Sequence, residues 1–135
     1  MSADPIRVLL VDDSADQRAG YRLLLGSQPD ILVVGQAGDG AQALGMLRRE
    51  HVDVVLMDVQ MPRVNGLVAA ARIREDEQVR ALGLLPRLVL LATVDLDDHV
   101  AAAAVSGAFA ILYKDVDPEA LFGVIRDAAA YRGEL

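Results

Sequence analysis

Asp58 is the residue whose position most needs a chemical explanation. It follows residues 54–57, a continuous apolar run of the kind found in a strand buried on both faces of a parallel sheet. Burying an unpaired carboxylate costs several kcal/mol. Asp58 must therefore meet water at a strand edge, pair with a cationic side chain, or hold a metal ion.

Four further reactive side chains follow predicted strands in the same way. Asp12 and Asp13 follow the first strand, Thr93 follows the fourth, and Lys114 follows the fifth. Because ligands bind beyond the carboxyl ends of the strands in an open parallel sheet, we expect all five side chains at one rim. A divalent cation and one lysine would together balance the charge of three carboxylates there.

The types of these side chains indicate a cation and a reaction. Carboxylate oxygens without His or Cys favour Mg²⁺. A rim that holds Mg²⁺, the Lys114 ammonium and the Thr93 hydroxyl is equipped to stabilise a phosphoryl group. Asp58 is then the predicted nucleophile, as a carboxylate is in aspartyl-phosphate chemistry.

The elements that must position this rim alternate along the chain. Five short runs rich in Leu or β-branched residues predict strands, and a stretch with helical spacing comes after each, which indicates an α/β fold with a mainly parallel sheet. The predicted strands are residues 6–11, 31–34, 52–57, 88–92 and 109–113. Residues 75–87 are expected to form a longer connection that is exposed at its charged start.

Capping residues and apolar spacing define the predicted helices. The expected helix starts are Ser14 with Gln17, Asn65, Asp97, and Asp117 followed by Pro118. The expected core-facing residues are Tyr21, Leu23, Leu24, Leu44, Leu47, Ala69, Ile73, Leu121, Val124, Ile125 and Ala128. The alanine-rich helix near residues 99–107 has small side chains that would anchor it weakly.

Composition narrows the class of protein. The chain has 135 residues, 53% of them hydrophobic, and no Cys, which predicts one domain without disulfides or thiolate metal sites. No apolar run has the length of a membrane span or a signal peptide, so we expect a soluble cytoplasmic protein that does not contact a membrane. The net charge of −7 would repel the phosphate backbone of a nucleic acid, so no direct contact with nucleic acid is expected.

Five segments, in this order, resemble a response-regulator receiver domain of the NarL/FixJ (LuxR-type) subfamily. They are RVLLVDDSADQRAGYRLLL, VVGQAGDGAQAL, DVVLMDVQMPRVNGL, LATVDLDDHV and GAFAILYKDVDPEAL. The resemblance covers about residues 5–132. It implies a flavodoxin-like (CheY-like) doubly wound sheet of five parallel strands in the order 2-1-3-4-5, with five helices. Residues 1–135 are thus expected to form a single receiver domain, with the output domain absent from this chain.

The same resemblance assigns roles to individual positions. Asp58 matches the phosphoacceptor, and Thr93 and Lys114 match the hydroxyl and ammonium that meet the phosphoryl group. The expected Mg²⁺ ligands are Asp12, Asp13, Asp58 and the backbone carbonyl of Gln60. Gln60 and Asp95 match the positions that tune hydrolysis.

Two positions depart from the family pattern. Where the family usually has a switch aromatic, this chain has Ile111, and Tyr113 lies two residues further along the same strand, hence on the same side of the sheet. Ile111 and Tyr113 are therefore both switch candidates, although Tyr113 could equally be a core or interface aromatic. Lys114 is followed by Asp115 instead of proline, so we expect a trans peptide bond there.

The resemblance implies a phosphorylation-controlled switch in two-component signal transduction. A sensor histidine kinase would supply the phosphoryl group to Asp58 with Mg²⁺, and the chain would catalyse only its own phosphorylation and dephosphorylation. The expected partners are that kinase, a second copy in a phosphorylation-linked homodimer, and a helix-turn-helix output domain in the full-length protein, which controls transcription.

Two rival functions remain compatible with parts of this pattern. A degenerate receiver could act as an interaction module independent of phosphorylation, although no acid or lysine is lost. A small Mg-dependent phosphatase with an Asp nucleophile would need a second acid where Gln60 stands, and a cap over its substrate. Thr93 could also be a simple strand residue and Lys114 a solvated surface lysine.

Overall fold

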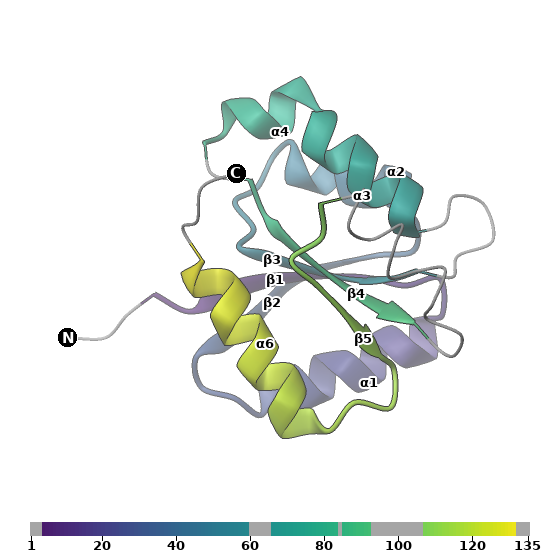
Figure 1. The fold of residues 1–135 in the computed structure, drawn as a ribbon, viewed down its shortest axis with the longest axis vertical. Helices are drawn as coiled ribbons and strands as arrows, with labels where there is room; N and C mark the ends of the chain where they lie inside the picture. The colour runs from purple at the N-terminus through teal and green to yellow at the C-terminus, as the bar shows by residue number, and fades with distance from the viewer. Residues whose placement is uncertain (1–3, 60–65, 84, 93–106, 132–135) are drawn as a thin grey trace.

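A five-stranded parallel sheet forms the centre of the molecule (Figure 1). The computed structural model describes residues 4–59, 66–83, 85–92 and 107–131. The strand order is β2-β1-β3-β4-β5, as expected for a doubly wound receiver-like fold. The strands are β1 (Ile6–Val11), β2 (Ile31–Ala37), β3 (Val54–Asp58), β4 (Arg87–Ala92) and β5 (Ala110–Tyr113).

Helices cover both faces of this sheet. Figure 1 shows α1 and α6 on one face and α2, α3 and α4 on the other. Their bounds are α1 (Ala15–Gly26), α2 (Gly40–Leu47), α3 (Gly66–Glu75), α4 (Glu77–Ala81) and α6 (Pro118–Ala130). No helix in the described part of the chain has the length and apolarity that crossing a membrane requires.

The hydrophobic core has two layers, one on each face of the sheet, because successive side chains of a strand point to opposite faces. On the α2–α3–α4 face, Leu9, Val55 and Leu90 are buried together with side chains of those helices. On the α1–α6 face, Leu10 and Leu56 are buried together with side chains of α1 and α6. The central strands β3 and β4 are buried along their whole length, as their continuous apolar sequences predict.

The order of the strands reverses at β1. β1 pairs in parallel with β2 on one side and with β3 on the other, so the chain winds outward in both directions from it. The carboxyl ends of β1 and β3 are therefore the topological switch point, where an open α/β sheet leaves a crevice for ligands. The predicted rim of reactive side chains lies at this crevice.

The helix starts agree with the sequence where the structure describes them. Ser14 caps α1, since its side-chain oxygen accepts a hydrogen bond from the Gln17 backbone N–H at 3.2 Å. Asp117 is the N-cap residue of α6 and Pro118 its first residue, as expected. Asn65, Asp97 and the helix expected near residues 99–107 lie outside the described residues.

Three expectations about the elements were wrong. Leu23 was expected in the core but is 80% exposed, and Leu25 is the buried leucine of α1. The connection predicted over residues 75–87 contains the short helix α4, which Asp76 caps by accepting from the Val79 N–H at 3.0 Å. β2 also extends beyond the predicted residue 34 to Ala37, since its pairing with β1 continues to that residue after a register shift between Val8 and Leu9.

Candidate functional site

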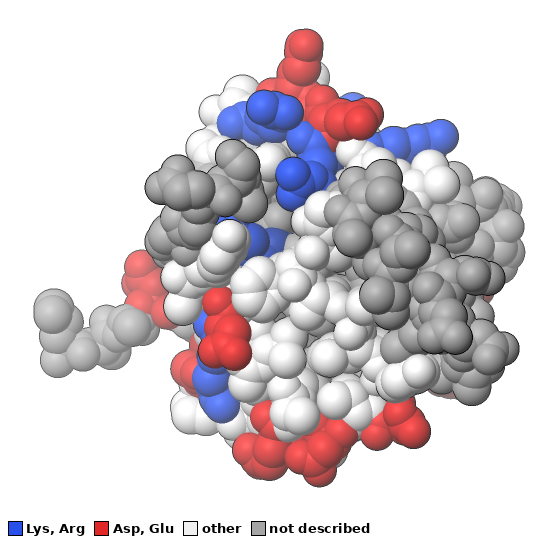
Figure 2. All heavy atoms as spheres, viewed as in Figure 1, with Lys and Arg blue, Asp and Glu red and all other residues white. Residues whose placement is uncertain are grey.

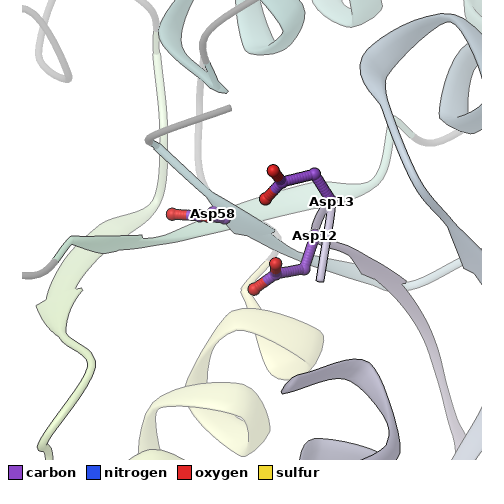
Figure 3. Close-up of side chains that lie close together, drawn as sticks. All are labelled: Asp12, Asp13 and Asp58. Atoms are coloured by element: carbon purple, nitrogen blue, oxygen red, sulfur yellow. The ribbon is translucent and has the colours of Figure 1, made fainter. Parts of the chain in front are cut away.

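Three carboxylates meet at the carboxyl ends of β1 and β3. Asp12 and Asp13 follow β1 directly, and Asp58 is the last residue of β3. One carboxylate oxygen of each lies within 4.8 Å of one from each of the others, and Figure 3 shows all three groups pointing to the same side. Asp12 and Asp58 are buried, whereas Asp13 is exposed, so the cluster opens to solvent at Asp13.

The chain around Asp12 fixes its direction. Its backbone N–H donates to the Ala37 carbonyl at 3.1 Å, and its side chain accepts from the Ser14 N–H at 2.9 Å. The Arg18 guanidinium donates to the Asp12 carbonyl oxygen from the first turns of α1. These contacts hold the backbone at the end of β1, so that the second carboxylate oxygen of Asp12 is available to the cluster.

Lys114 supplies the positive charge of the site. Its backbone N–H donates to the Ala92 carbonyl at 2.7 Å, which fixes the residue just after β5. Its ammonium nitrogen lies 3.2 Å from Asp58 Oδ2 and 3.5 Å from Asp12 Oδ2. The Lys114 side chain is only 16% exposed, so these are sheltered ion pairs, less screened than surface pairs. Asp58 is thus a paired carboxylate, one of the three alternatives that its sequence position allowed.

Of the contacts that Lys114 makes with described residues, the shortest is with a neutral side chain. Gln17 Oε1 accepts a hydrogen bond from the ammonium at 2.6 Å, so the lysine is shared between α1 and the carboxylates. The sequence pattern assigned Gln17 only to the cap of α1. Its position one turn after the acidic pair is the signal that could have placed it near the site, because α1 begins at this rim.

Tyr21 lies on the same helix beside the charged cluster. Burial raises the pKa of its phenol above the ordinary value of 10.0, with Asp12 and Asp58 raising it further and Lys114 lowering it. Gln17, Gly20, Tyr21, Leu24 and Lys114 line a shallow groove between α1 and the end of β5. The sequence identified Tyr21 as a core residue, and its proximity to the cluster was not predicted.

The charges of the site fit a divalent cation. Among the described residues, three carboxylates and one ammonium leave two formal negative charges in a partly buried site, which is costly without a further cation. The donor set is entirely oxygen from carboxylates, the set that Mg²⁺ prefers, and exposed Asp13 leaves room for the waters that Mg²⁺ retains. Asp12, Asp13 and Asp58 therefore suit Mg²⁺ by number, type and spacing.

The remaining predicted site residues are placed only in part. Gln60, Thr93 and Asp95 lie outside the described residues. Ile111 is partly buried against the α2–α3–α4 layer of the core, whereas Tyr113, the last residue of β5, is 45% exposed. The described residues contain no cis peptide bond, in agreement with the trans bond expected after Lys114.

The comparison with protein families gives one match to most of the chain. Residues 8–126 match the family described as response regulator receiver domain. The Bacillus subtilis (strain 168) transcriptional regulatory protein YxjL is 40% identical over 136 residues, which is 99% of this chain and 58% of YxjL. The Escherichia coli (strain K12) nitrate/nitrite response regulator protein NarP is 37% identical over 127 residues, covering 94% of this chain and 56% of NarP. The chain thus spans less than two thirds of the length of these relatives.

The comparison with solved structures also identifies receiver domains. The signal receiver domain of the response regulator NarL from Mycobacterium tuberculosis superposes with a TM-score of 0.83 at 32% identity. The match covers 96% of this chain and 100% of that domain. The similarity therefore extends over the sheet, both helical layers and the rim that carries Asp12, Asp13 and Asp58.

Proposed function

The chain belongs to the response regulator receiver domain family, and on that premise we propose that it accepts a phosphoryl group on Asp58 from a sensor histidine kinase. The observation that carries the proposal is the geometry around Lys114, whose ammonium lies 3.2 Å from Asp58 and 3.5 Å from Asp12. A nucleophilic carboxylate, two further acids and an ammonium are thereby assembled at the switch point of the sheet.

The proposed transfer forms one bond and breaks one. A carboxylate oxygen of Asp58 attacks the phosphorus of a phosphohistidine, a P–O bond forms, and the P–N bond breaks. The imidazole nitrogen leaves with the electron pair of that bond and takes a proton from solvent. Lys114 balances the negative charge that the phosphoryl oxygens bring to the buried end of β3.

Asp12, Asp13 and Asp58 are the side chains proposed to hold Mg²⁺, together with the backbone carbonyl of Gln60. When bound, the ion neutralises charge on the phosphoryl oxygens and on the clustered carboxylates. Asp12 is already oriented for this role by the Ser14 N–H, and Asp13 faces solvent, from which the ion enters.

Thr93, Ile111 and Tyr113 are the residues proposed to carry the signal away from Asp58. The Thr93 hydroxyl would turn toward the phosphoryl group, and the side chains on β5 would respond. Ile111 and Tyr113 share one face of β5, so a movement of the chain beside Ile111 would be felt by the exposed Tyr113 ring. Gln60 and Asp95 are proposed to set the lifetime of the phosphoryl group.

A receiver domain is not an enzyme in the usual sense, and we propose that this chain acts only on its own Asp58. The regulatory names of YxjL and NarP, and the share of them that this chain covers, support control of a DNA-binding output domain in a longer protein. A phosphorylation-linked homodimer and a cytoplasmic location belong to the same proposal.

The experiment is the intact mass of the protein after incubation with a small phosphodonor and Mg²⁺. We expect one added phosphoryl group in the wild type, none after removal of Mg²⁺, and none in Asp58→Asn. Asp30→Asn is the matched control, because Asp30 pairs with Arg126 away from the site, and it should be phosphorylated like the wild type. An adduct that persists in Asp58→Asn would contradict the proposal. Where no adduct accumulates, a stable beryllofluoride complex that needs Asp58 supports it, and the lack of that complex refutes it.

A further inference from the structure

Arg87 is a buried cation at the opposite end of the sheet from Asp58. It is the first residue of β4 and only 7% exposed. Its guanidinium donates to the Leu85 carbonyl at 2.8 Å and to the Tyr131 carbonyl at 2.9 Å. Its Nε is sealed from solvent and has no hydrogen-bond acceptor among the described residues. One donor of this guanidinium therefore lacks a partner within the described ranges.

The charge of Arg87 is also uncompensated within the described part of the chain. None of the carboxylates described forms an ion pair with Arg87, whereas Arg48 and Arg126 both have one. The Tyr131 ring, with its centroid 5.3 Å from the guanidinium carbon, gives only a cation–π contact. A buried guanidinium without an anion is costly, and the Nε–H edge is one through which arginine binds a carboxylate in two parallel hydrogen bonds.

A cavity of about 270 Å³ lies beside this cation. Its walls combine a second guanidinium, from Arg74, with the apolar side chains of Leu85, Pro86 and Phe109 and with Tyr131. Its charged lining residues among those described are the two arginines alone. Figure 2 shows Lys and Arg atoms at the bottom of a recess on this face and continuing upward over α3 and α4.

The shape of the cavity is held by contacts between its walls. Arg74 donates to the Gly107 carbonyl at 3.0 Å, which ties the end of α3 to the segment that leads into β5. The rings of Phe109 and Tyr131 lie 5.4 Å apart between centroids, which ties that segment to the end of α6. The cavity is therefore bounded by the end of α3, the start of β4, residues 107–109 before β5 and the residue after α6. It lies away from the carboxylates of the proposed phosphorylation site.

We propose that this cavity binds a small organic carboxylate. The carboxylate pairs with the Nε–H edge of Arg87 and lies within the field of Arg74, while the apolar part of the ligand packs against Leu85 and Phe109. The volume is at the lower end for ligand pockets, which fits one ring or a short chain and no larger molecule. A free phosphate dianion fits less well, because much of the wall is apolar and offers it no donors.

The test is an NMR titration of the whole chain with sodium benzoate as the probe. Arginine Nε–H groups give their own resonances, and the Nε–H of Arg87 should be protected from exchange because it is sealed from solvent. We expect benzoate to shift and saturate the Arg87 Nε–H resonance together with the backbone amides of Gly107, Phe109 and Tyr131. Equimolar sodium chloride and sodium phosphate should leave these resonances unchanged. Shifts that are absent, spread over the surface, or equal in chloride or phosphate would overturn the proposal.

Variants test which arginine makes the site. Arg87→Lys keeps a cation but loses the Nε–H edge, and Arg74→Gln removes the second guanidinium from a partly buried position; both should weaken benzoate binding at least several-fold. Arg126→Gln, whose guanidinium pairs with Asp30 outside the cavity, should bind benzoate like the wild type. If Arg87→Lys does not fold, the benzoate affinity of Arg74→Gln and the benzoate-induced shift of the Arg87 Nε–H resonance in the wild type test the proposal. Equal benzoate affinity in the wild type and Arg74→Gln, without a shift at Arg87, refutes the assignment.

Discussion

Gln17 Oε1 lies 2.6 Å from Lys114 Nζ, closer than either carboxylate that the ammonium contacts. The lysine that is proposed to meet an incoming phosphoryl group at Asp58 is therefore held from the side by an amide on α1. Movement of Lys114 toward a new charge on Asp58 stretches or breaks this hydrogen bond. If Asp58 is phosphorylated as proposed, breaking the Gln17–Lys114 hydrogen bond would add to the free-energy cost of that step.

Replacement of Gln17 by Met should speed phosphorylation of Asp58. Met keeps the length of the side chain but removes the oxygen that accepts from Lys114. One hydrogen bond contributes about 0.5–1.5 kcal/mol net, so we expect a rate increase of up to about tenfold. The measurement is the rate of phosphoryl adduct formation by mass spectrometry with a small phosphodonor. Gln28→Met, on a side chain that contacts Arg126, is the control. A rate equal to or below that of the wild type would show that Gln17 does not restrain Lys114.

Replacement of Asp13 by Asn should stabilise the metal-free protein and weaken its response to Mg²⁺. The three carboxylates lie within 4.8 Å of one another, so removing one charge relieves repulsion. Because Asp13 is exposed, screening limits the gain to about 1 kcal/mol. Urea unfolding with a chelator should show this gain, and added Mg²⁺ should stabilise the wild type more than the variant. An equal Mg²⁺ response in both proteins would show that Asp13 is not a ligand of the proposed metal site.

Leu25→Ala and Leu23→Ala form a matched pair on α1. Leu25 is fully buried, so its truncation should cost about 2–5 kcal/mol of the free energy of unfolding. Leu23 is 80% exposed, and its truncation should change that free energy by no more than about 0.5 kcal/mol. Urea unfolding of both variants under one condition measures the difference. Similar losses in the two variants would mean that α1 packs with a different face on the sheet.

The pair between Arg48 and Asp76 should contribute to stability against acid. The hydrogen bond from Arg48 lowers the pKa of Asp76 below its ordinary value of 3.8. A carboxyl group with a lowered pKa in the folded state adds stability that is complete well above 3.8 and is lost as pH falls through the folded value. Arg48→Gln should therefore destabilise the protein at neutral pH, and the difference from the wild type should shrink as the pH falls below 3.8. Urea unfolding midpoints of the wild type and Arg48→Gln, measured from neutral pH to below 3.8, test this prediction. If the difference between the two midpoints does not change with pH, the Arg48–Asp76 pair is not the cause of the destabilisation.

Gly107→Ala should destabilise the protein, whereas Gly20→Ala should not. Gly107 has φ of +78°, and a Cβ there would overlap the Arg74 guanidinium, so both the backbone and Arg74 would have to adjust. We expect a loss of about 1 kcal/mol or more. Gly20 lies inside α1 with open space around it, and alanine there should add about 0.5–1 kcal/mol of stability. Thermal unfolding of the two variants distinguishes these directions.

The fold and the acidic cluster were largely predictable from the sequence, because both depend on strand ends. Apolar runs locate strands, and parallel strands place the residues at their carboxyl ends on one rim, so Asp12, Asp58 and Lys114 could be brought together before any coordinates were known. The side-chain contact of Gln17 with Lys114 was not predictable in this way. It depends on how α1 is tilted over the end of the sheet, which the local spacing of residues does not specify.

The wrong expectations also concern features that the local spacing of residues does not specify. The run of three leucines in α1 gives little periodicity, so Leu23 and Leu25 could not be distinguished by spacing alone. The helix α4 is only five residues long, and its charged first turn is as typical of an exposed loop as of a helix. Arg87 was not singled out because a single arginine before a strand usually lies in solvent, and only the packing of Leu85 and Tyr131 around it makes it a buried group.

The ion pair between Asp12 and Lys114 joins residues 102 positions apart in the chain. During synthesis the acids of β1 and β3 emerge well before the lysine, which arrives with the last strand. A growing or truncated chain therefore carries the carboxylates without the ammonium that balances them, and long-range pairings of this kind form late in folding. If Asp58 accepts a phosphoryl group as proposed, a chain whose β5 has not joined the sheet would lack the ammonium needed to stabilise that group, and it would not respond to a phosphodonor.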